Sequence, residues 1–294
     1  MSVLGRALAI IVVAVLIQAC SPEQEIAPPS EVVSTPTLIV RGDRLFVAAR
    51  INGVETTDAL LDSGAEMSFL DKSFAEQVGL VTAGSETARG TGGEEEVTFA
   101  EGVTIEAAGL TLENQTVAVL DLSDISSRVV GYPVSIVVGR EIFDAARLKI
   151  DIEASSIEVI ARDADPVGVM LPMETHKGLQ TIPASVEGGE PVQADFDLGN
   201  GNDVLIGADY AERVGLSAPE RIVGQKAGGG IGGEVMRDMI VLRELEIAGV
   251  TFRDVLAAID RTDTAADLNV GVRVLRKFVI TTDFGQNAVW LQER

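Results

Sequence analysis

The sequence predicts an all-β protein with short helices, organised as two tandem lobes of one topology. Three observations lead to this prediction. The 294 residues are enough for roughly two domains. The composition, with 30 Gly but only 9 Phe, 2 Tyr and 1 Trp, is typical of short strands joined by many turns. Finally, several stretches of the first half return in the same order in the second half.

The repeat is the most informative of these observations. The stretch FAEQVGL at residues 74–80 returns as YAERVGL at residues 210–216, which is 136 positions later (210 − 74). Shorter matches follow in the same order, GGE at 92–94 and 232–234, and AGLT at 108–111 with AGVT at 248–251. An ordered series of such matches indicates that one structural unit occurs twice.

The repeat and the distribution of turn residues divide the chain into five parts. The connection between the two copies contains Pro166, Gly168 and Pro172, which favour a loop. We therefore expect a signal peptide over residues 1–20, a flexible tether over 21–37, an N-terminal lobe over 38–161, an interlobe linker over 162–178 and a C-terminal lobe over 179–294.

Each copy is expected to consist mainly of strands. In the first copy, the turn signals Asn52-Gly53 and Ala108-Gly109 each separate two apolar or alternating stretches and so predict two hairpins. Residues 71–78 have helical spacing, and Gly79 is a plausible helix stop. The expected strands cover residues 45–51, 57–61, 97–105, 110–120, 148–152 and 157–160, and a second short helix covers 141–147.

The N-terminus has the pattern of a targeting signal. Arg6 precedes the apolar run 7–17, which is too short to span a membrane, since that needs about 20 apolar residues. Ile17-Gln18-Ala19-Cys20 resembles the bacterial lipobox, in which the cysteine is lipidated. This resemblance, with Ser21 next, implies a lipid anchor at Cys20 in the outer membrane, facing the periplasm. The alternative is an ordinary signal peptide cut nearby, which would leave a free cysteine.

Composition excludes several functions. The formal charge of −22 argues against nucleic-acid binding, because no basic face is available to neutralise phosphates. One Cys and one His are too few for a Cys/His zinc site, and a Ser-His-Asp triad would have to use His176 in the linker. We expect neither a metal nor a cofactor. If the protein is an enzyme, carboxylates are its expected catalytic groups.

Two aspartates at matching positions are the candidate catalytic groups. In the stretch ALLDSGAEMSFL at 59–70, Asp62 follows an apolar run and is followed by the turn residues Ser63 and Gly64. Counting back from the repeat places Asp197 at the position of Asp62 (197 − 62 = 135). One aspartate in each copy of a duplicated fold predicts a site in which the two carboxylates meet near a pseudo-two-fold axis.

The first stretch also resembles a known signature. Ala59–Leu70 is similar to the active-site segment of retropepsin-like aspartic proteases, and Val137–Glu141 to their apolar-apolar-Gly-Arg-acid segment. Gly90–Gly93 and Gly228–Gly233 resemble the glycines of their flaps. The resemblance extends over residues 38–292, as two retropepsin-like lobes in one chain.

The resemblance implies both a fold and an activity. The fold would be two closed β-barrel lobes related by pseudo-two-fold symmetry. The activity would be that of a monomeric aspartic endopeptidase, in which Asp62 and Asp197 activate water against an extended peptide or protein substrate. The implied active-site loops contain Ser63, Gly64, Ala65, Leu198 and Gly199, and the implied flap residues are Gly92, Gly93, Gly232 and Gly233.

The second loop departs from the family pattern. Leu198 stands where the first loop has Ser63, although hydroxyl groups after both aspartates brace the two loops in the family. We therefore expect Ser63 to need another partner and the second loop to be held by packing, with Asn200 and Asn202 as candidate donors. Two other functions stay open, a catalytically silent peptide- or partner-binding module and a homodimeric protease that uses Asp62 alone. The single-chain protease requires the carboxyl groups of Asp62 and Asp197 to lie within hydrogen-bond reach, so their separation tests it against these alternatives.

Overall fold

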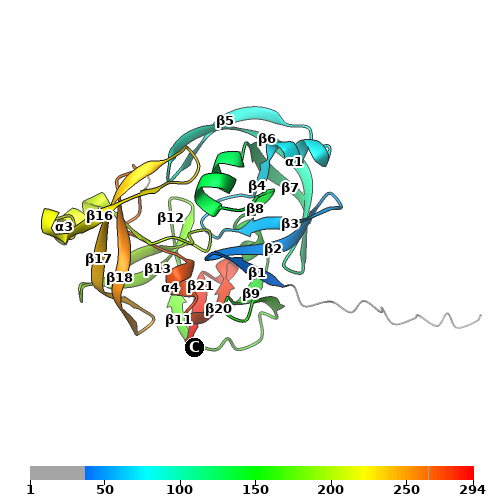
Figure 1. Cartoon of the computed structure of the whole chain (residues 1–294). Helices are drawn as coiled ribbons and strands as arrows, with labels where there is room; N and C mark the ends of the chain where they lie inside the picture. The colour runs from blue at the N-terminus through cyan, green and yellow to red at the C-terminus, as the bar shows by residue number, and fades with distance from the viewer. Residues whose placement is uncertain (1–36, 264) are drawn as a thin grey trace, which may run out of the picture. The chain divides into compact units, whose positions relative to one another are not determined.

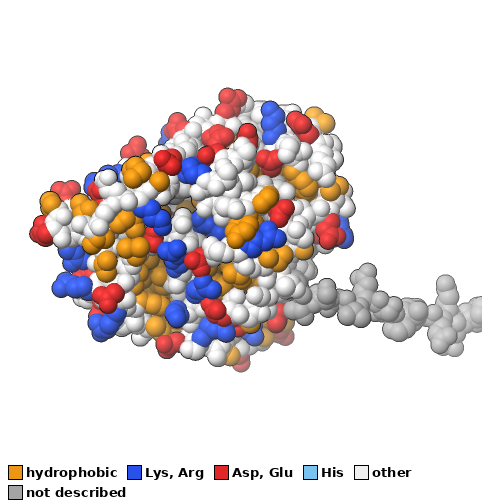
Figure 2. Space-filling view, in the orientation of Figure 1, with side chains coloured by type: hydrophobic (Ala, Val, Ile, Leu, Met, Phe, Trp, Pro, Cys, Tyr) orange, Lys and Arg blue, Asp and Glu red, His pale blue; other side chains and the backbone are white. Residues whose placement is uncertain are grey.

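The computed structural model describes residues 37–263 and 265–294 (Figure 1). The predicted signal peptide, the lipidation site Cys20 and residues 21–36 of the predicted tether lie outside the described residues. No helix in the described part of the chain is long and apolar enough to cross a membrane. On the face shown in Figure 2, acidic and basic side chains are interspersed.

The first large sheet is a closed ring of strands. Its order is β1-β2-β3-β8-β4-β7-β6-β5, and β2 also pairs with β6, so the strands from β2 to β6 close on themselves. Its members are β1 (Leu38–Arg41), β2 (Arg44–Ile51), β3 (Val54–Leu61), β4 (Phe69–Asp71), β5 (Ala83–Gly90), β6 (Gly93–Ala107), β7 (Leu110–Leu120) and β8 (Ile136–Val138).

The second large sheet has the same order of corresponding strands. It runs β12-β13-β14-β19-β15-β18-β17-β16 and is closed by pairing of β13 with β17. The fold is therefore all-β with two closed lobes, which confirms the predicted class. The strands are β12 (Glu174–His176), β13 (Leu179–Val186), β14 (Val192–Phe196), β15 (Val204–Gly207), β16 (Ile222–Gly228), β17 (Val235–Ile247), β18 (Val250–Asp260) and β19 (Leu268–Val270).

A third sheet joins the two lobes. Its order is β10-β9-β20-β21-β11, so strands from both halves of the chain pair directly. Its members are β9 (Arg147–Asp151), β10 (Ser156–Ile160), β11 (Val169–Pro172), β20 (Phe278–Asp283) and β21 (Ala288–Glu293). The segment expected to be an interlobe loop thus contains β11 and β12, each of which adds an edge strand to a sheet.

A buried ion pair fixes the third sheet. Arg147 Nε lies 3.1 Å from the Asp283 carboxylate, and both side chains are almost fully buried. The same guanidinium donates hydrogen bonds to Ala164 O and Gln286 Oε1. A buried charge without such partners would be strongly destabilising, so this network is coupled to the joining of the lobes.

Short helices cap the barrels. The α1 helix (Lys72–Gln77) begins where the Asp71 carboxylate accepts the Ser73 N–H at 2.9 Å, and it ends near Gly79, where φ is 73°. The other helices are η1 (Ile125–Val130, a π-helix), α2 (Glu141–Ala145), α3 (Ala208–Arg213), η2 (Pro219–Arg221), α4 (Val272–Leu275) and η3 (Phe284–Gln286).

Two hydrophobic clusters position the site. The larger one runs through both lobes and includes Leu61, Leu198 and Ile280. The smaller one belongs almost entirely to the first lobe, and its buried members include Phe46, Leu60 and Val137. It lies beside the first active-site loop, so the two lobes present different surfaces there.

Candidate active site

The first loop begins where β3 ends. Asp62 donates its N–H to Val138 O at 3.0 Å, which ties the start of the loop to β8. The Gly64 N–H then donates to Asp62 Oδ1 at 2.8 Å. Ala65 continues the turn, donating to Asp62 O and accepting from the Arg140 N–H at 3.0 Å. The loop therefore holds the Asp62 carboxyl group through the main chain.

The second loop repeats this arrangement after β14. Asp197 donates its N–H to Val270 O at 3.0 Å, the counterpart of the bond from Asp62 to β8. Asp197 Oδ1 accepts the N–H groups of Gly199 and Asn200, both at 2.9 Å. Its second oxygen, Oδ2, accepts Asn269 Nδ2 at 2.7 Å. The Asp197 carboxylate thus accepts three N–H groups, whereas the Asp62 carboxyl accepts one.

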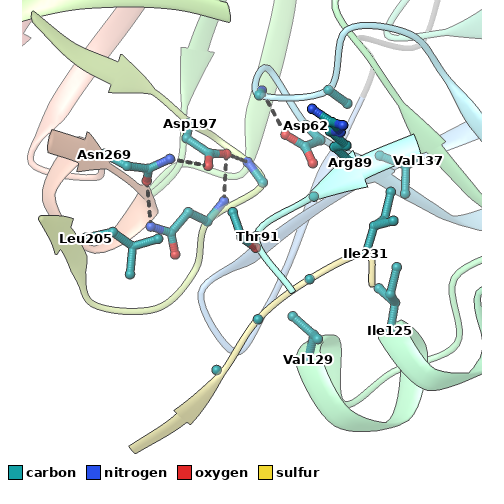
Figure 3. A pocket seen from close by; sticks show the side chains of 18 of the residues that line it. Asp62, Arg89, Thr91, Ile125, Val129, Val137, Asp197, Leu205, Ile231 and Asn269 are labelled. Carbon is teal, nitrogen blue, oxygen red and sulfur yellow. Dashed lines mark hydrogen bonds between the residues drawn. The ribbon is translucent and has the colours of Figure 1, made fainter. Parts of the chain in front are cut away.

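The two glycines show how closely the loops approach each other. A Cβ atom added to Gly64 would lie 2.9 Å from Asp197 Cγ, and one added to Gly199 would lie 2.2 Å from Asp62 Cγ. Each glycine therefore packs against the carboxyl group of the opposite loop, and any larger residue there would overlap with it. The structure brings Asp62 and Asp197 together at one cavity of about 630 Å³ (Figure 3).

The proximity of the two carboxyl groups affects their titration. Burial raises the pKa of Asp62 to about 7, and the charge of Asp197 and a hydrogen-bonding contact with its side chain contribute in the same direction. The Gly64 N–H and Arg44 act in the opposite direction on this pKa. With this raised pKa, the Asp62 carboxyl is protonated at acidic pH.

Ser63 connects the two loops despite the leucine opposite it. Its hydroxyl donates to Phe196 O at 2.7 Å and accepts the Leu198 N–H at 2.9 Å. Both partners are main-chain groups of the second loop, so no side-chain hydroxyl is needed there. Leu198 itself is fully buried in the larger hydrophobic cluster. The expectation that packing alone holds the second loop is wrong, because Ser63 also braces it.

Comparisons with known proteins find one similar family and a similar solved structure. Residues 47–142 match a family model described as aspartyl protease. Over this segment the chain is similar to aspartyl proteases. A solved structure, a retropepsin-like aspartic protease from Rickettsia conorii, matches with 18% identity and a TM-score of 0.34, covering 42% of this chain and 88% of that one. A comparison with curated proteins finds no match.

The segment of the aspartyl protease match contains Asp62 and ends before Asp197. The second loop is therefore related to the first through the equal strand order of the two sheets. The loop after β3 and the loop after β14 occupy the same place in that order.

Asn269 is a residue of the candidate site that sequence reasoning missed. It lies on β19, is nearly buried, and donates to Asp197 Oδ2 through its amide nitrogen. Its amide oxygen accepts Asn200 Nδ2 at 2.8 Å, so Asn200 acts on the dyad through both its main chain and Asn269. Asn202 contributes its N–H to Asn200 Oδ1 at 2.9 Å. A polar residue in the middle of the run LNV was the available signal.

Arg44 is the second missed residue. It is only 3% exposed, and its guanidinium donates to Gly199 O at 2.8 Å and to Val129 O at 3.1 Å. Its charge acts on the carboxyl groups of both Asp62 and Asp197. Arg44 therefore links the first lobe to the second loop and balances part of the negative charge at the dyad. An arginine at the start of the apolar strand β2 was the sequence signal.

The predicted flap glycines lie at two hairpin tips above the cavity. The first tip joins β5 to β6, and the second joins β16 to β17. Gly92 donates its N–H to Ile231 O at 3.0 Å across the lobes. A Cβ added to Gly92 would overlap with Gly233, and one added to Gly232 would overlap with Gly93. All four glycines are therefore brought together, and the tips touch.

Charged side chains strengthen the contact between the tips. Arg237 Nη2 donates to Thr91 O at 2.8 Å, and Arg128 donates to Gly228 O and Gly230 O at 3.1 and 3.2 Å. Ile231 packs against the smaller hydrophobic cluster, beside Val137 in Figure 3. The tips thus cover the cavity and also fill part of its apolar side.

The chain's histidine lies away from the candidate active site. His176 is exposed at the end of β12 and takes no part in the cavity lining. Within residues 37–263 and 265–294, no three His, Cys, Asp or Glu side chains are grouped so that they could hold a metal ion.

Proposed function

We propose that the protein is an aspartic endopeptidase in which Asp62 and Asp197 form one catalytic dyad within a single chain. The observation that carries this proposal is the reciprocal packing of Gly64 and Gly199 against the opposite carboxyl groups. The raised pKa of Asp62 supports it, since Asp197 is one of its causes. Two carboxyl groups this close share a proton, which is the state that hydrolysis needs.

The hydrogen bonds suggest which aspartate has which role. Donors aimed at a carboxylate favour its ionised form. Asp197 accepts three N–H groups, whereas Asp62 accepts one. We assign Asp197 as the ionised general base and Asp62 as the protonated general acid.

The reaction follows from these roles. A water molecule between the carboxyls loses a proton to Asp197 as its oxygen attacks the peptide carbonyl carbon. Asp62 donates its proton to the carbonyl oxygen, giving a neutral tetrahedral diol. When the C–N bond breaks, the nitrogen takes the proton held by Asp197, and Asp62 recovers a proton from a diol hydroxyl. Both groups return to their starting states.

The cavity suits an extended peptide. It is about 630 Å³ in volume and is lined by residues of both lobes and both hairpin tips. Glycine-rich tips present main-chain groups with little steric hindrance, so they can align a peptide backbone by hydrogen bonds once they part. Closure of the tips afterwards would exclude bulk water from the dyad.

Cleavage of a peptide library from acidic to neutral pH tests the proposal. The wild type should cleave, a pepstatin-type inhibitor should block it, and Asp62→Asn and Asp197→Asn should each lose activity by about 10³-fold or more. Exposed Asp254→Asn, on β18 away from the cavity, is a control for the loss of one carboxylate.

Two other outcomes would replace the proposal with the alternatives. Loss in Asp62→Asn but full activity in Asp197→Asn, together with a dimer in light scattering, would indicate a homodimeric protease that pairs Asp62 from two chains. Binding of peptides without cleavage by the wild type would indicate a silent binding module.

We also propose, from the N-terminal sequence, that Cys20 bears a lipid and anchors the protein in the bacterial envelope. Cys20 lies outside the described residues. Incorporation of labelled palmitate by the wild type and its absence in Cys20→Ala is the expected result. Equal labelling of both, or release of wild type as a soluble periplasmic protein, would contradict it.

A further inference from the structure

The cavity around the dyad has two chemically different walls. The wall from the first lobe belongs to the smaller hydrophobic cluster and includes Leu60, Val97 and Val137. The wall from the second lobe includes Asp195, Arg237 and Asn269. Because both sheets have the same strand order, the two walls can be compared residue by residue.

Strand pairing provides that comparison. In the first lobe, Leu60 of β3 pairs with Val137 of β8. In the second lobe, Asp195 of β14 pairs with Asn269 of β19. Leu60 and Asp195 each lie two residues before the aspartate of their loop. Val137 and Asn269 are their partners on the neighbouring strand. The same two positions are therefore apolar in one lobe and polar in the other.

Asp195 faces the cavity as the dyad does. Residues two apart on an extended chain point to the same side, so the side chains of Asp195 and Asp197 share one face. Asp195 is 7% exposed and lines the cavity. Burial, followed by the charge of Asp197, raises the pKa of Asp195 to about 7. An ion at this position is therefore costly unless a cation joins it.

The other buried acids of this wall already have cations. Asp203 lies 2.7 Å from both Lys226 Nζ and Arg273 Nη1, and Asp260 lies 3.2 Å from Arg237 Nη2. Asp195, in contrast, has no salt bridge within residues 37–263 and 265–294. The charge of exposed Lys177 acts on it from the cavity rim without forming an ion pair. Asp195 is thus the acid of this wall that a ligand cation could neutralise.

We propose that Asp195, together with Asn269, forms a pocket for a Lys or Arg side chain of the substrate, next to the scissile bond. The dyad lies between the two lobes, so the residues on either side of that bond meet opposite walls. The wall of Leu60 and Val137 receives an apolar side chain. This proposal rests on the proposed peptidase function and narrows its substrates to peptides with an apolar residue on one side of the bond and a basic residue on the other.

Peptide series with Lys, Arg, norleucine or Gln at that position test the pocket. The wild type should prefer Lys and Arg over norleucine by about tenfold or more in kcat/KM. Asp195→Leu, which copies Leu60 of the first lobe, should reverse this preference while keeping cleavage of peptides apolar on both sides. Asp195→Asn removes the charge with little change of shape, and it tests the same point if the leucine variant does not fold.

A matched control separates the pocket from general electrostatics. Asp238→Asn removes an acid of the same lobe that is already bound to Arg261 at 2.9 Å and does not line the cavity. It should keep the wild-type preference. An equal loss of preference in both variants would show that net charge, rather than the pocket, selects the peptide.

The outcomes distinguish the pocket from the peptidase function. Cleavage by the wild type with no preference for Lys or Arg overturns the pocket and leaves the peptidase intact. If the wild type cleaves nothing, the peptidase function fails, and binding of peptides with a reduced scissile bond still tests the pocket. Tighter binding of the Lys peptide than of the norleucine peptide, lost in Asp195→Leu, supports it, and equal binding refutes it.

Discussion

The two active-site loops occupy the same place in two sheets of one strand order, but they are stabilised differently. The first loop holds its aspartate with one main-chain donor and reaches across with the Ser63 hydroxyl. The second holds its aspartate with three donors, one of them from Asn269, and buries Leu198. The two copies of the fold therefore contribute different groups to the site. One loop supplies the brace between lobes, and the other supplies the more strongly hydrogen-bonded carboxylate.

The largest effect on activity is expected when an added methyl group pushes the two loops apart. Gly199→Ala should lower kcat/KM by about 10²-fold or more, because its Cβ would lie 2.2 Å from Asp62 Cγ and displace the carboxyl. Gly64→Ala should have a smaller effect, since the corresponding distance is 2.9 Å. Steady-state kinetics of both variants checks the order. Gly224→Ala, where an added Cβ meets nothing within 4 Å, is the control.

The bracing of the loops can be tested by stability. Leu198→Ala should lower the free energy of unfolding by about 2–4 kcal/mol, because it leaves a cavity in the core. Ser63→Ala should lower it by about 1–3 kcal/mol, since two buried main-chain groups lose their partner. Urea denaturation measures both. No change in Ser63→Ala would show that the Ser63 hydroxyl does not brace the loops.

Asn269→Val would make the second lobe resemble the first, which has Val137 at this place. The substitution removes one of the three hydrogen bonds that hold the carboxylate of Asp197, the proposed general base, in position. We expect kcat at mildly acidic pH to fall by about tenfold. Circular dichroism of the variant distinguishes this loss from simple misfolding, and Asn202→Ala is the control.

The fall of activity at high pH, the basic limb of the pH profile, is expected to depend on Asp62 in the first loop. Activity of the wild type should fall as the pH rises through about 7, where the Asp62 carboxyl loses the proton required for acid catalysis. Asn269→Val should leave this limb nearly unchanged, because Asn269 contacts Asp197 rather than Asp62. A shift of this limb in Asn269→Val would show that the two roles are not divided between the loops.

The smallest expected effect is a change in stability caused by Asp195, which lines the cavity on the side of the second lobe. The pKa of Asp195 is raised from 3.8 to about 7, so its contribution to stability is fully present below 3.8 and is lost as pH rises through about 7. Asp195→Asn should therefore raise the stability at pH 8 relative to pH 4, by on the order of 1 kcal/mol. Thermal denaturation at the two pH values measures this. Leu60→Val on the opposite wall should change stability equally at both.

The sequence was sufficient where a property depends on neighbouring residues. The turns Asn52-Gly53 and Ala108-Gly109 adopt positive φ angles, as their hairpins need, and α1 ends near Gly79 as predicted. The apolar run before Asp62 forms β3. Counting along the repeat also led to Asp197, because the loop after β14 copies the loop after β3.

What the sequence did not reveal depends on the pairing of distant strands. Asn269 reaches Asp197 from 72 residues away in the chain, and Arg44 reaches Gly199 O from 155 residues away. The partners of Ser63 were missed for another reason. They are main-chain groups, which no residue type reveals, so the change from a hydroxyl to Leu198 looked more disruptive than it is.

The contact between the two hairpin tips has a kinetic consequence. Gly92 donates its N–H to Ile231 O and Arg237 donates to Thr91 O, so two hydrogen bonds join the tips above the dyad. A polypeptide longer than the cavity can pass beneath only after these bonds break. For the proposed peptidase, the rate of peptide capture should therefore level off at high peptide concentration, at the rate at which the tips separate. If the proposed peptidase function holds, only a segment of a folded protein that stays extended long enough for the tips to reopen and close around it should be processed.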